Sequence, residues 1–161
     1  MRKSPIKRSK HIFKLSKDHH FTLLFSWKIR QGIKNGVQAE RIRKYVRYFW
    51  HHDMQPHFRQ EDDTLFAPLK DDKVQRAIAE HHEIRRKIDN ALKTFDHEEL
   101  SRQLLSLADA VDAHVRYEER ELFPYLEQTL TEIQLAAIGK QLEEQPVVHD
   151  IYEDEFWIKA Q

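Results

Sequence analysis

Apolar residues recur along this chain at spacings of three and four, the pattern of a helix that buries one face. The segment 72–94 shows it best, because apolar side chains from Val74 to Phe95 fall on one arc at about 100° per residue. Only 3 glycines and 5 prolines interrupt such runs, so helices are favoured over a turn-rich β fold. The pattern predicts helices from Leu15 to Gly32 or Gly36, and over 39–65, 72–94, 97–130 and 132–144.

Prolines and capping residues refine the expected helix boundaries. Pro56 lies inside the second helix and Pro124 near the end of the fourth, so each predicts a kink or a brief interruption. Pro68 ends the second helix. Thr131, with Gln134 three residues later, predicts a capping box at the start of the fifth helix.

The expected organisation is one domain with an extension at each end. Residues 1–11 are rich in lysine and arginine and are expected to form a disordered basic arm. The helices over 12–130 form the domain itself, and 131–161 adds a short helix and a tail that pack on it. The stretch from Tyr152 to Trp157 mixes acidic and aromatic residues, and we expect it to dock on the domain surface.

Composition excludes several classes of function. The chain has 161 residues, with 27 Lys+Arg balanced by 27 Asp+Glu, so its net charge favours neither nucleic acid nor a membrane surface as partner. Cysteine is absent, which excludes disulfides, thiolate catalysis and iron–sulfur sites. No apolar run approaches the roughly 20 residues of a membrane span, and no secretory signal follows the basic start. We therefore expect a cytoplasmic protein.

A ten-residue phrase, H-x-R-x-E-x-x-x-L-F, occurs twice. His57 opens the first copy and His114 the second; Glu61 and Glu118 follow four residues later. Residues four apart lie on one helix face, so each copy points an imidazole and a carboxylate the same way. A helix bundle that holds two such pairs facing inward can bind two metal ions in its core.

Each copy is preceded by a helix that carries a further inward histidine. In the segment 72–94, His81 lies inside the apolar arc, whereas His82 lies about a third of a turn away among charged residues. In the first helix the choice is between His19 and His20, because apolar residues occur nearly all round it. We favour His19, since an acidic residue precedes both it and His81.

A metal site is weighed against a purely structural polar core. A single inward histidine is more often a hydrogen-bonded core residue than a ligand. Two inward glutamates, however, need protonation, a counter-charge or a metal. Arg59 and Arg116 point about 200° away from those glutamates and cannot neutralise them locally. Nitrogen and oxygen donors without thiolate favour iron, with zinc or manganese as alternatives.

Together these residues resemble the hemerythrin-like HHE cation-binding family over 12–130. The resemblance rests on the motifs Leu15-Ser-Lys-Asp-His19, His57-x-x-x-Glu61, Glu80-His81 and His114-x-x-x-Glu118. It implies an all-α, up-down-up-down four-helix bundle with a non-haem centre of two iron ions. It further implies that the two glutamates bridge the irons beside an oxo or hydroxo group. The implied imidazole ligands are His19, His57, His81 and His114.

Two departures separate this chain from the oxygen-carrying hemerythrins, which have H-x-x-x-H on the third helix and H-x-x-x-x-D on the fourth. Here Arg85 stands four residues after His81, and the last motif is H-x-x-x-E. The resemblance therefore implies one histidine fewer and an extra open or water-filled coordination position. A simple oxygen carrier is not expected.

Three functions remain open at this point. The favoured one is a binding or sensing protein that responds to oxygen, nitric oxide or redox and iron status. The second is a di-iron enzyme, either an oxidase consuming peroxide or oxygen or a repair factor for iron centres. The third is a structural bundle without physiological metal. The expected partner is a small diatomic ligand; a protein partner is left open, and so is the choice between monomer and homodimer.

Overall fold

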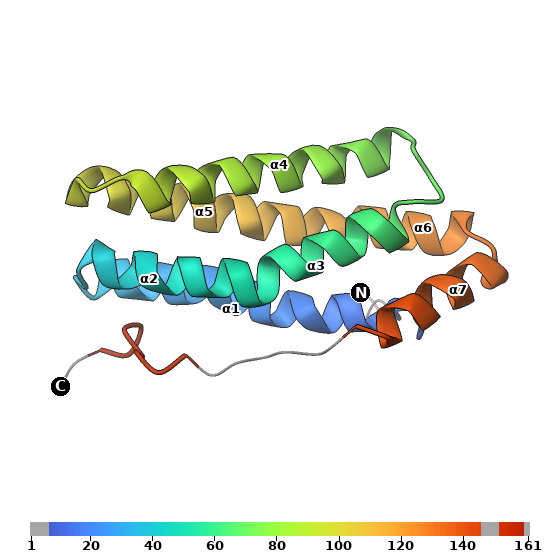
Figure 1. Ribbon diagram of the computed structural model, residues 1–161, viewed down its shortest axis with the longest axis horizontal. Helices are drawn as coiled ribbons and strands as arrows, with labels where there is room; N and C mark the ends of the chain where they lie inside the picture. Colours follow the sequence, from blue (N-terminus) through green and yellow to red (C-terminus); the bar gives the residue numbers. More distant parts are fainter. Residues whose placement is uncertain (1–6, 146–151, 160–161) are drawn as a thin grey trace, which may run out of the picture.

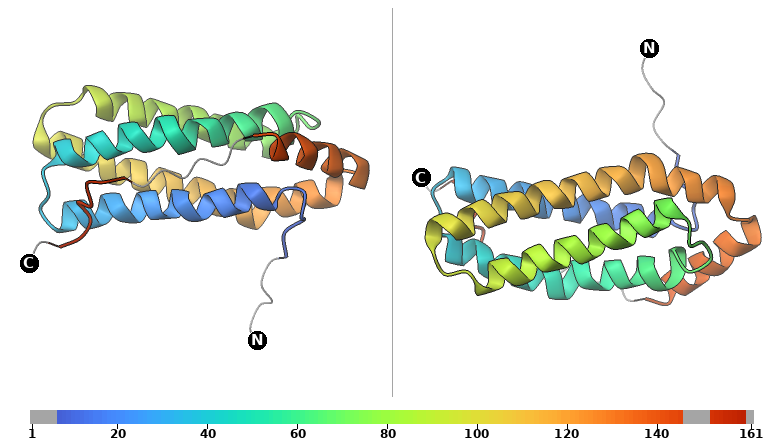
Figure 2. Two further views of the ribbon diagram at one scale, coloured as in Figure 1. Left: turned by 60° about the horizontal axis from the view of Figure 1, so that its bottom comes forward. Right: turned by 90° about the horizontal axis from the view of Figure 1, so that it is seen from above.

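The computed structural model describes residues 7–145 and 152–159, and these residues form helices without any strand. Long helical runs lie side by side, and a shorter helix follows at one end (Figures 1 and 2). None of the described helices is both long enough and apolar enough to cross a membrane. The long runs begin with α1 (Phe13–Lys34), α2 (Ala39–Phe49), α4 (Asp72–Lys93) and α5 (His97–Tyr117). The shorter helix is α7 (Glu132–Glu143).

Side-chain caps determine where three of the helices begin. The Asp71 carboxylate accepts a hydrogen bond from a backbone N–H in the first turn of α4, and Asp96 does the same for α5. Thr131 and Gln134 form the expected capping box of α7. Each cap satisfies N–H groups that have no partner within the helix.

Three π-helical turns widen the longer runs. Two of them, η1 (Trp50–Met54) and η2 (Glu61–Leu65), flank α3 (Gln55–Gln60), and η3 (Glu118–Leu122) leads into α6 (Phe123–Thr129). Each closes with a backbone N–H bonded to the carbonyl five residues earlier: Gln55 to Trp50, Phe66 to Glu61 and Phe123 to Glu118. Such turns are rare in helices and frequent at functional sites.

The two prolines expected to kink helices lie just after such turns. Pro56 falls in the first turn of α3, and Pro124 in the first turn of α6. The residues before these two turns, Met54 and Leu122, keep helical backbone angles, so neither proline lies at the free end of a helix. The interruption expected at each proline is thus a widened turn, past which the helical run continues.

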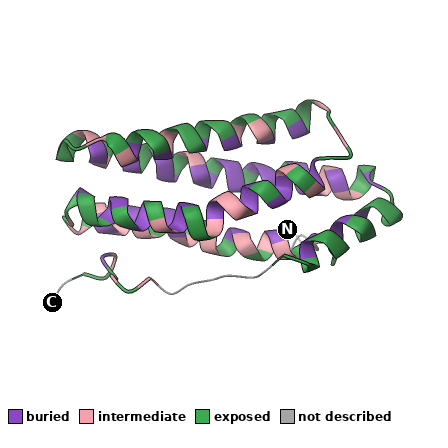
Figure 3. Ribbon diagram, viewed as in Figure 1, coloured by how far each residue is buried: buried purple, intermediate pink, exposed green. Residues whose placement is uncertain are grey.

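A layer of buried polar residues divides the apolar core in two. On α1, Leu15 belongs to one apolar cluster and Phe25 to the other, and His19 lies between them. The same order recurs on α4, where His81 lies between the clusters. Figure 3 shows buried residues recurring along each long helix between exposed ones. The apolar clusters on both sides hold the helices in register around this layer.

The described part of the N-terminal arm packs on the helices, whereas the sequence predicted a disordered basic arm over 1–11. The Arg8 side chain is only 4% exposed and forms ion pairs with Glu119 and Glu127. Ile12 is fully buried. Acidic partners on a distant helix neutralise this basic segment, which composition alone suggested would remain in solvent. Residues 1–6 lie outside the described part.

The tail over 152–159 lies along α1 and α2, and the residues 146–151 and 160–161 on either side of it lie outside the described part (Figure 2). Phe156 is 1% exposed and packs so closely on Gly32 that a Cβ there would lie 2.8 Å from its ring. Asn35 Nδ2 donates to the Trp157 carbonyl at 3.1 Å. Buried aromatic area thus holds this segment on the helices.

We expect Phe156→Ala to lower the free energy of unfolding by about 3 kcal/mol, because it empties a buried aromatic site. The matched control is Ile133→Ala on α7, whose side chain is 83% exposed and whose loss should cost less than about 0.5 kcal/mol. Urea unfolding followed by circular dichroism measures both. Equal effects would mean that the tail contributes nothing to stability.

Candidate metal centre

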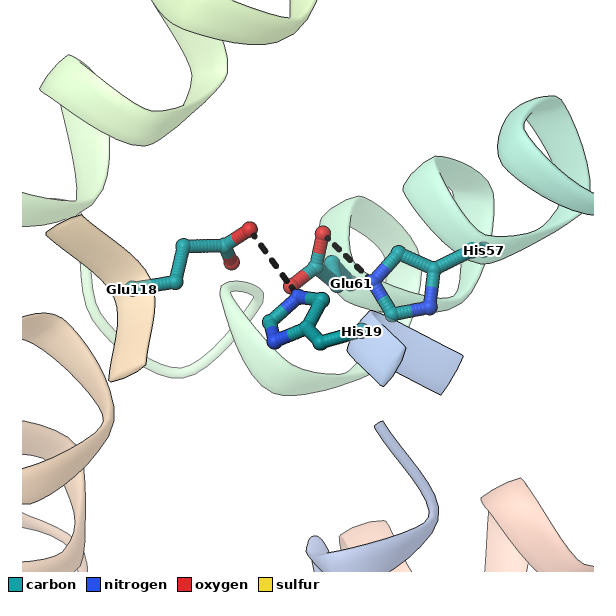
Figure 4. Close-up of side chains that lie close together, drawn as sticks. All are labelled: His19, His57, Glu61 and Glu118. Atoms are coloured by element: carbon teal, nitrogen blue, oxygen red, sulfur yellow. Dashed lines mark ion pairs between the residues drawn. The ribbon is translucent and has the colours of Figure 1, made fainter. Parts of the chain in front are cut away.

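The six residues predicted as metal ligands meet in the polar layer between the apolar clusters. Four helical runs supply them, and every one of these residues is at most 5% exposed. They are His19 on α1, His57 on α3, Glu61 at the start of η2, His81 on α4, His114 on α5 and Glu118 at the start of η3. Figure 4 shows four of them converging.

Each glutamate lies between imidazoles from different helices. The distances from carboxylate oxygen to Nε2 are 3.3 Å (Glu61 to His57), 3.1 Å (Glu61 to His81), 2.5 Å (Glu118 to His114) and 3.6 Å (Glu118 to His19). Donor atoms lie within 4.8 Å of one another in two groups, which are His19, His57, Glu61 and Glu118, and Glu61, His81, His114 and Glu118. Both groups contain both glutamates.

The repeated phrase explains this placement. In each copy the glutamate opens a π-helical turn, and the phenylalanine that ends the phrase donates its N–H to that glutamate's carbonyl. The leucine before it, Leu65 or Leu122, is fully buried in the apolar cluster beside the site. The L-F pair therefore anchors the widened turn that carries the carboxylate.

In each of the four central imidazoles, Nδ1 is the nitrogen that faces away from the two glutamates, and it contacts a further carboxylate, which we call the outer carboxylate. The Nδ1 distances are 2.6 Å (His19 to Glu119), 3.1 Å (His57 to Asp18), 2.9 Å (His81 to Asp62) and 2.8 Å (His114 to Glu80). A carboxylate that accepts the Nδ1 proton orients the ring and leaves the Nε2 lone pair free for a metal. All four rings are thus held with Nε2 toward the centre.

Our sequence reasoning did not assign these four outer carboxylates. A signal for them exists, because each is the immediate sequence neighbour of a predicted ligand. Asp18 and Glu80 precede His19 and His81, while Asp62 and Glu119 follow Glu61 and Glu118. Each acid contacts a histidine on a different element from its own neighbour, so the pairing appears only once the helices are packed.

Several polar atoms at the centre form ion pairs at most and make no hydrogen bond of normal geometry among the described residues. They are Nε2 of His19, His57 and His114, Oε2 of Glu61 and both carboxylate oxygens of Glu118. Buried polar atoms are nearly always paired, and a cluster of such orphans calls for a ligand. Among the described ion pairs the two glutamates meet only histidines, and Arg59 and Arg116 are exposed. Cations bound in the two donor groups would satisfy these atoms.

Without a cation, burial and the neighbouring charged groups shift the pKa values of the residues at the centre. Burial, together with the charge of Glu118, raises the pKa of Glu61 to about 8. Burial alone would raise the pKa of Glu118 as well, but His114 and the other polar neighbours lower it well below the usual value. Burial opposes the charge of His114, yet Glu118 raises its pKa to about 10. The centre therefore holds protons that a metal would displace.

The donor set is of the kind that holds metal cations. Imidazole and carboxylate donors without thiolate suit iron, manganese or zinc. Two inward carboxylates shared by two groups of histidines are the arrangement by which helix bundles hold dinuclear centres. Fold and site together define a helical protein with a buried cation-binding core.

Comparison with known families agrees. The family model of the hemerythrin HHE cation-binding domain matches residues 11–133, which include all six central residues, and the chain belongs to that family. No curated protein and no solved structure matches the chain.

The histidines next to the central ones point elsewhere. His19 is 3% exposed and His81 is 4% exposed, whereas His20 and His82 are exposed. The histidine favoured from the sequence, by helix phase for His81 and by the preceding acidic residue for His19, is therefore the buried member of each doublet. His52 is also exposed, and its ring stacks on Tyr48.

Proposed function

We propose that this protein binds two iron ions at the buried centre and responds to oxygen, nitric oxide or redox and iron status. The single observation that carries the proposal is the pair of four-residue groups that share Glu61 and Glu118. A dinuclear centre needs carboxylates within reach of both metal positions, and the groups provide them. Zinc and manganese remain the alternative metals.

Six donors for two ions leave coordination positions for a small ligand. Each group supplies two imidazoles and two shared carboxylates, whereas octahedral ions take about six donors. Arg85, in place of a further histidine, is exposed and lies with its guanidinium 5.5 Å from the Trp50 ring. Bound iron would supply one-electron redox chemistry and open sites for diatomic ligands.

The surroundings of the centre suit such a role. The Phe58 ring stacks on His81 with centroids 3.9 Å apart, and Phe123 stacks on His19 at 5.4 Å. Aromatic faces on both imidazoles exclude water and lower the local dielectric, which strengthens the hold of the charged donors. The outer carboxylates keep the rings oriented.

We also propose the up-down-up-down bundle of the family for this chain. The sequence colours in Figures 1 and 2 run back and forth along the neighbouring helical runs, which supports alternating directions. Short connections between α1 and α2, and between α4 and α5, support antiparallel neighbours.

Protein purified after iron-replete expression is expected to hold two iron ions per chain, because two donor groups are present. Elemental analysis measures the stoichiometry. In air, an oxo bridge between the irons should give a charge-transfer band in the near ultraviolet, and reduction with dithionite should remove this band. Anaerobic titration of the reduced protein with nitric oxide should then change the spectrum. One tightly bound zinc per chain, with no iron, would contradict the proposal. Multiple-turnover consumption of peroxide or oxygen would favour the enzyme instead.

A further inference from the structure

Three of the four outer carboxylates form an ion pair with a lysine or an arginine. Lys14 Nζ lies 3.2 Å from Asp18, Arg76 Nε lies 3.0 Å from Glu80, and Arg8 Nη2 lies 3.0 Å from Glu119. Lys14 and Arg76 stand on the same helix as their acids, four residues away. Arg8 differs, because it precedes α1 and reaches an acid 111 residues further along the chain.

Arg8 donates a hydrogen bond to the carboxylate that orients His19, which is that of Glu119. Its Nη2 donates to Glu119 Oε2 at 3.0 Å and to the Glu119 carbonyl at 2.8 Å, while Glu119 Oε1 accepts from His19 Nδ1 at 2.6 Å. The Glu119 carboxylate therefore has one oxygen on the arginine and the other on the imidazole. Charge-assisted contacts of this kind are the strong ones.

A second contact joins Arg8 to the same imidazole through an aromatic ring. The Arg8 guanidinium lies 5.4 Å from the centroid of Phe123, and the His19 ring stacks on Phe123 at 16° between planes. Phe123 is fully buried and begins α6 directly after the π-helical turn of Glu118. Arg8 thus supports His19 both through a carboxylate and through packing.

The segment that carries Arg8 is anchored at points outside the centre. Arg8 Nη1 also pairs with Glu127, and the Ser9 backbone N–H donates to the same carboxylate at 2.6 Å. His11 packs on Gly139 of α7, where a Cβ would lie 3.1 Å from the His11 Cα. Residues 7–12, which we call the N-terminal strap, therefore connect α6 and α7 to the centre.

We propose that Arg8 is a positioning residue for the metal position of His19 and His57, so that the N-terminal strap controls how tightly one of the two ions is held. The inference rests on the proposed dinuclear centre and adds that its two positions are unequal. For His81 and His114, the carboxylates that orient the rings, Asp62 and Glu80, lie on the helical runs themselves. Arg76, which pairs with Glu80, also lies on a helical run. Among the described contacts, the His19 position alone depends on a segment before the first helix.

The test is the release of ferrous iron from loaded protein to an excess of a coloured chelator, under anaerobic conditions. In Arg8→Ala one of the two irons should leave faster than from the wild type, while the other keeps its rate. Arg8→Lys should recover only part of the loss, because an ammonium cannot hold the carboxylate and the carbonyl as a planar fork does. Arg41→Ala, which breaks an exposed pair with Asp154, is the matched control and should change neither rate.

Two further variants separate positioning from general destabilisation. Glu119→Gln with Arg8→Ala should accelerate release by less than the two single changes multiplied together, since Arg8 acts in part through that carboxylate. Gly139→Leu should reproduce the selective loss without altering Arg8, because its side chain displaces the strap at His11. Wild-type release of both irons in Arg8→Ala, or equal acceleration of both, overturns the inference and leaves the dinuclear centre standing. Absence of bound iron from the wild type overturns the proposed function, and this inference with it.

Discussion

Glu61→Ala and Glu118→Ala are each expected to remove most of the iron from the protein. Each carboxylate belongs to both donor groups, so its loss weakens both metal positions at once. The loss of affinity should exceed the roughly 100-fold that marks the upper range for residues that only orient a ligand. Elemental analysis after purification, and competition with a chelator of known affinity, measure the effect.

Matched histidine pairs supply the controls. His81→Ala should lose at least one ion, whereas His82→Ala, one residue away and exposed, should keep both. His20→Ala should keep both for the same reason. A damaging His82→Ala with a harmless His81→Ala would contradict the geometry described here.

A melting experiment distinguishes loss of metal from loss of fold. Without metal, Glu61 and Glu118 are buried acids that meet only histidines among the described ion pairs. Replacing one by alanine leaves a cavity and takes a partner from the buried histidines, so the metal-free variant should melt below the metal-free wild type but still unfold cooperatively. Iron loss together with loss of the cooperative melting transition would indicate that the glutamate is needed for folding.

Periodicity predicted the helices well because their burial is one-sided. In α4 the apolar arc ended with Phe95, yet the helix ends at Lys93 and Phe95 is 81% exposed. The extended backbone of Thr94 breaks the phase, and the Arg43 guanidinium instead lies 4.7 Å from the Phe95 ring. A periodic pattern thus predicts a face only as far as the helix itself continues.

The central donors could be predicted because their spacing is local. His57 and Glu61 lie four residues apart on one face, and the second copy repeats this arrangement. The outer carboxylates could not be predicted this way, since Asp18 contacts His57 across 39 residues and depends on how two helices are rotated. The role of Arg8 could not be predicted for the same reason, because its partners lie more than 100 residues away.

The π-helical turns were also beyond the sequence pattern. A widened turn shifts the helix phase by one residue, and the apolar spacing after Glu61 or Glu118 does not reveal it. What the sequence does contain is the identical L-F pair in both copies. In the structure this pair closes the turn and anchors it in the core.

Metal-free protein is expected to melt below the metal-bound form, and the gap should widen as pH rises from about 5 to about 8. The pKa of Glu61 is raised to about 8, so the metal-free fold keeps a proton that the unfolded chain loses near its ordinary value. That stabilisation is present at low pH and is lost as pH rises toward 8. His114, with its pKa raised to about 10, changes stability in the same direction at higher pH.

The metal-bound form responds in the opposite direction. A metal displaces those protons, so its affinity grows with pH, and below about pH 5 protonated histidines release it. At 100 times the dissociation constant a ligand stabilises by about 2.7 kcal/mol, which corresponds to roughly 5–10 °C in a domain of this size. Thermal melts of both forms across this pH range, with the chelated protein reloaded as control, measure the gap. Equal melting temperatures at every pH would mean that the buried acids are satisfied without metal, and the structural-bundle hypothesis would then be preferred.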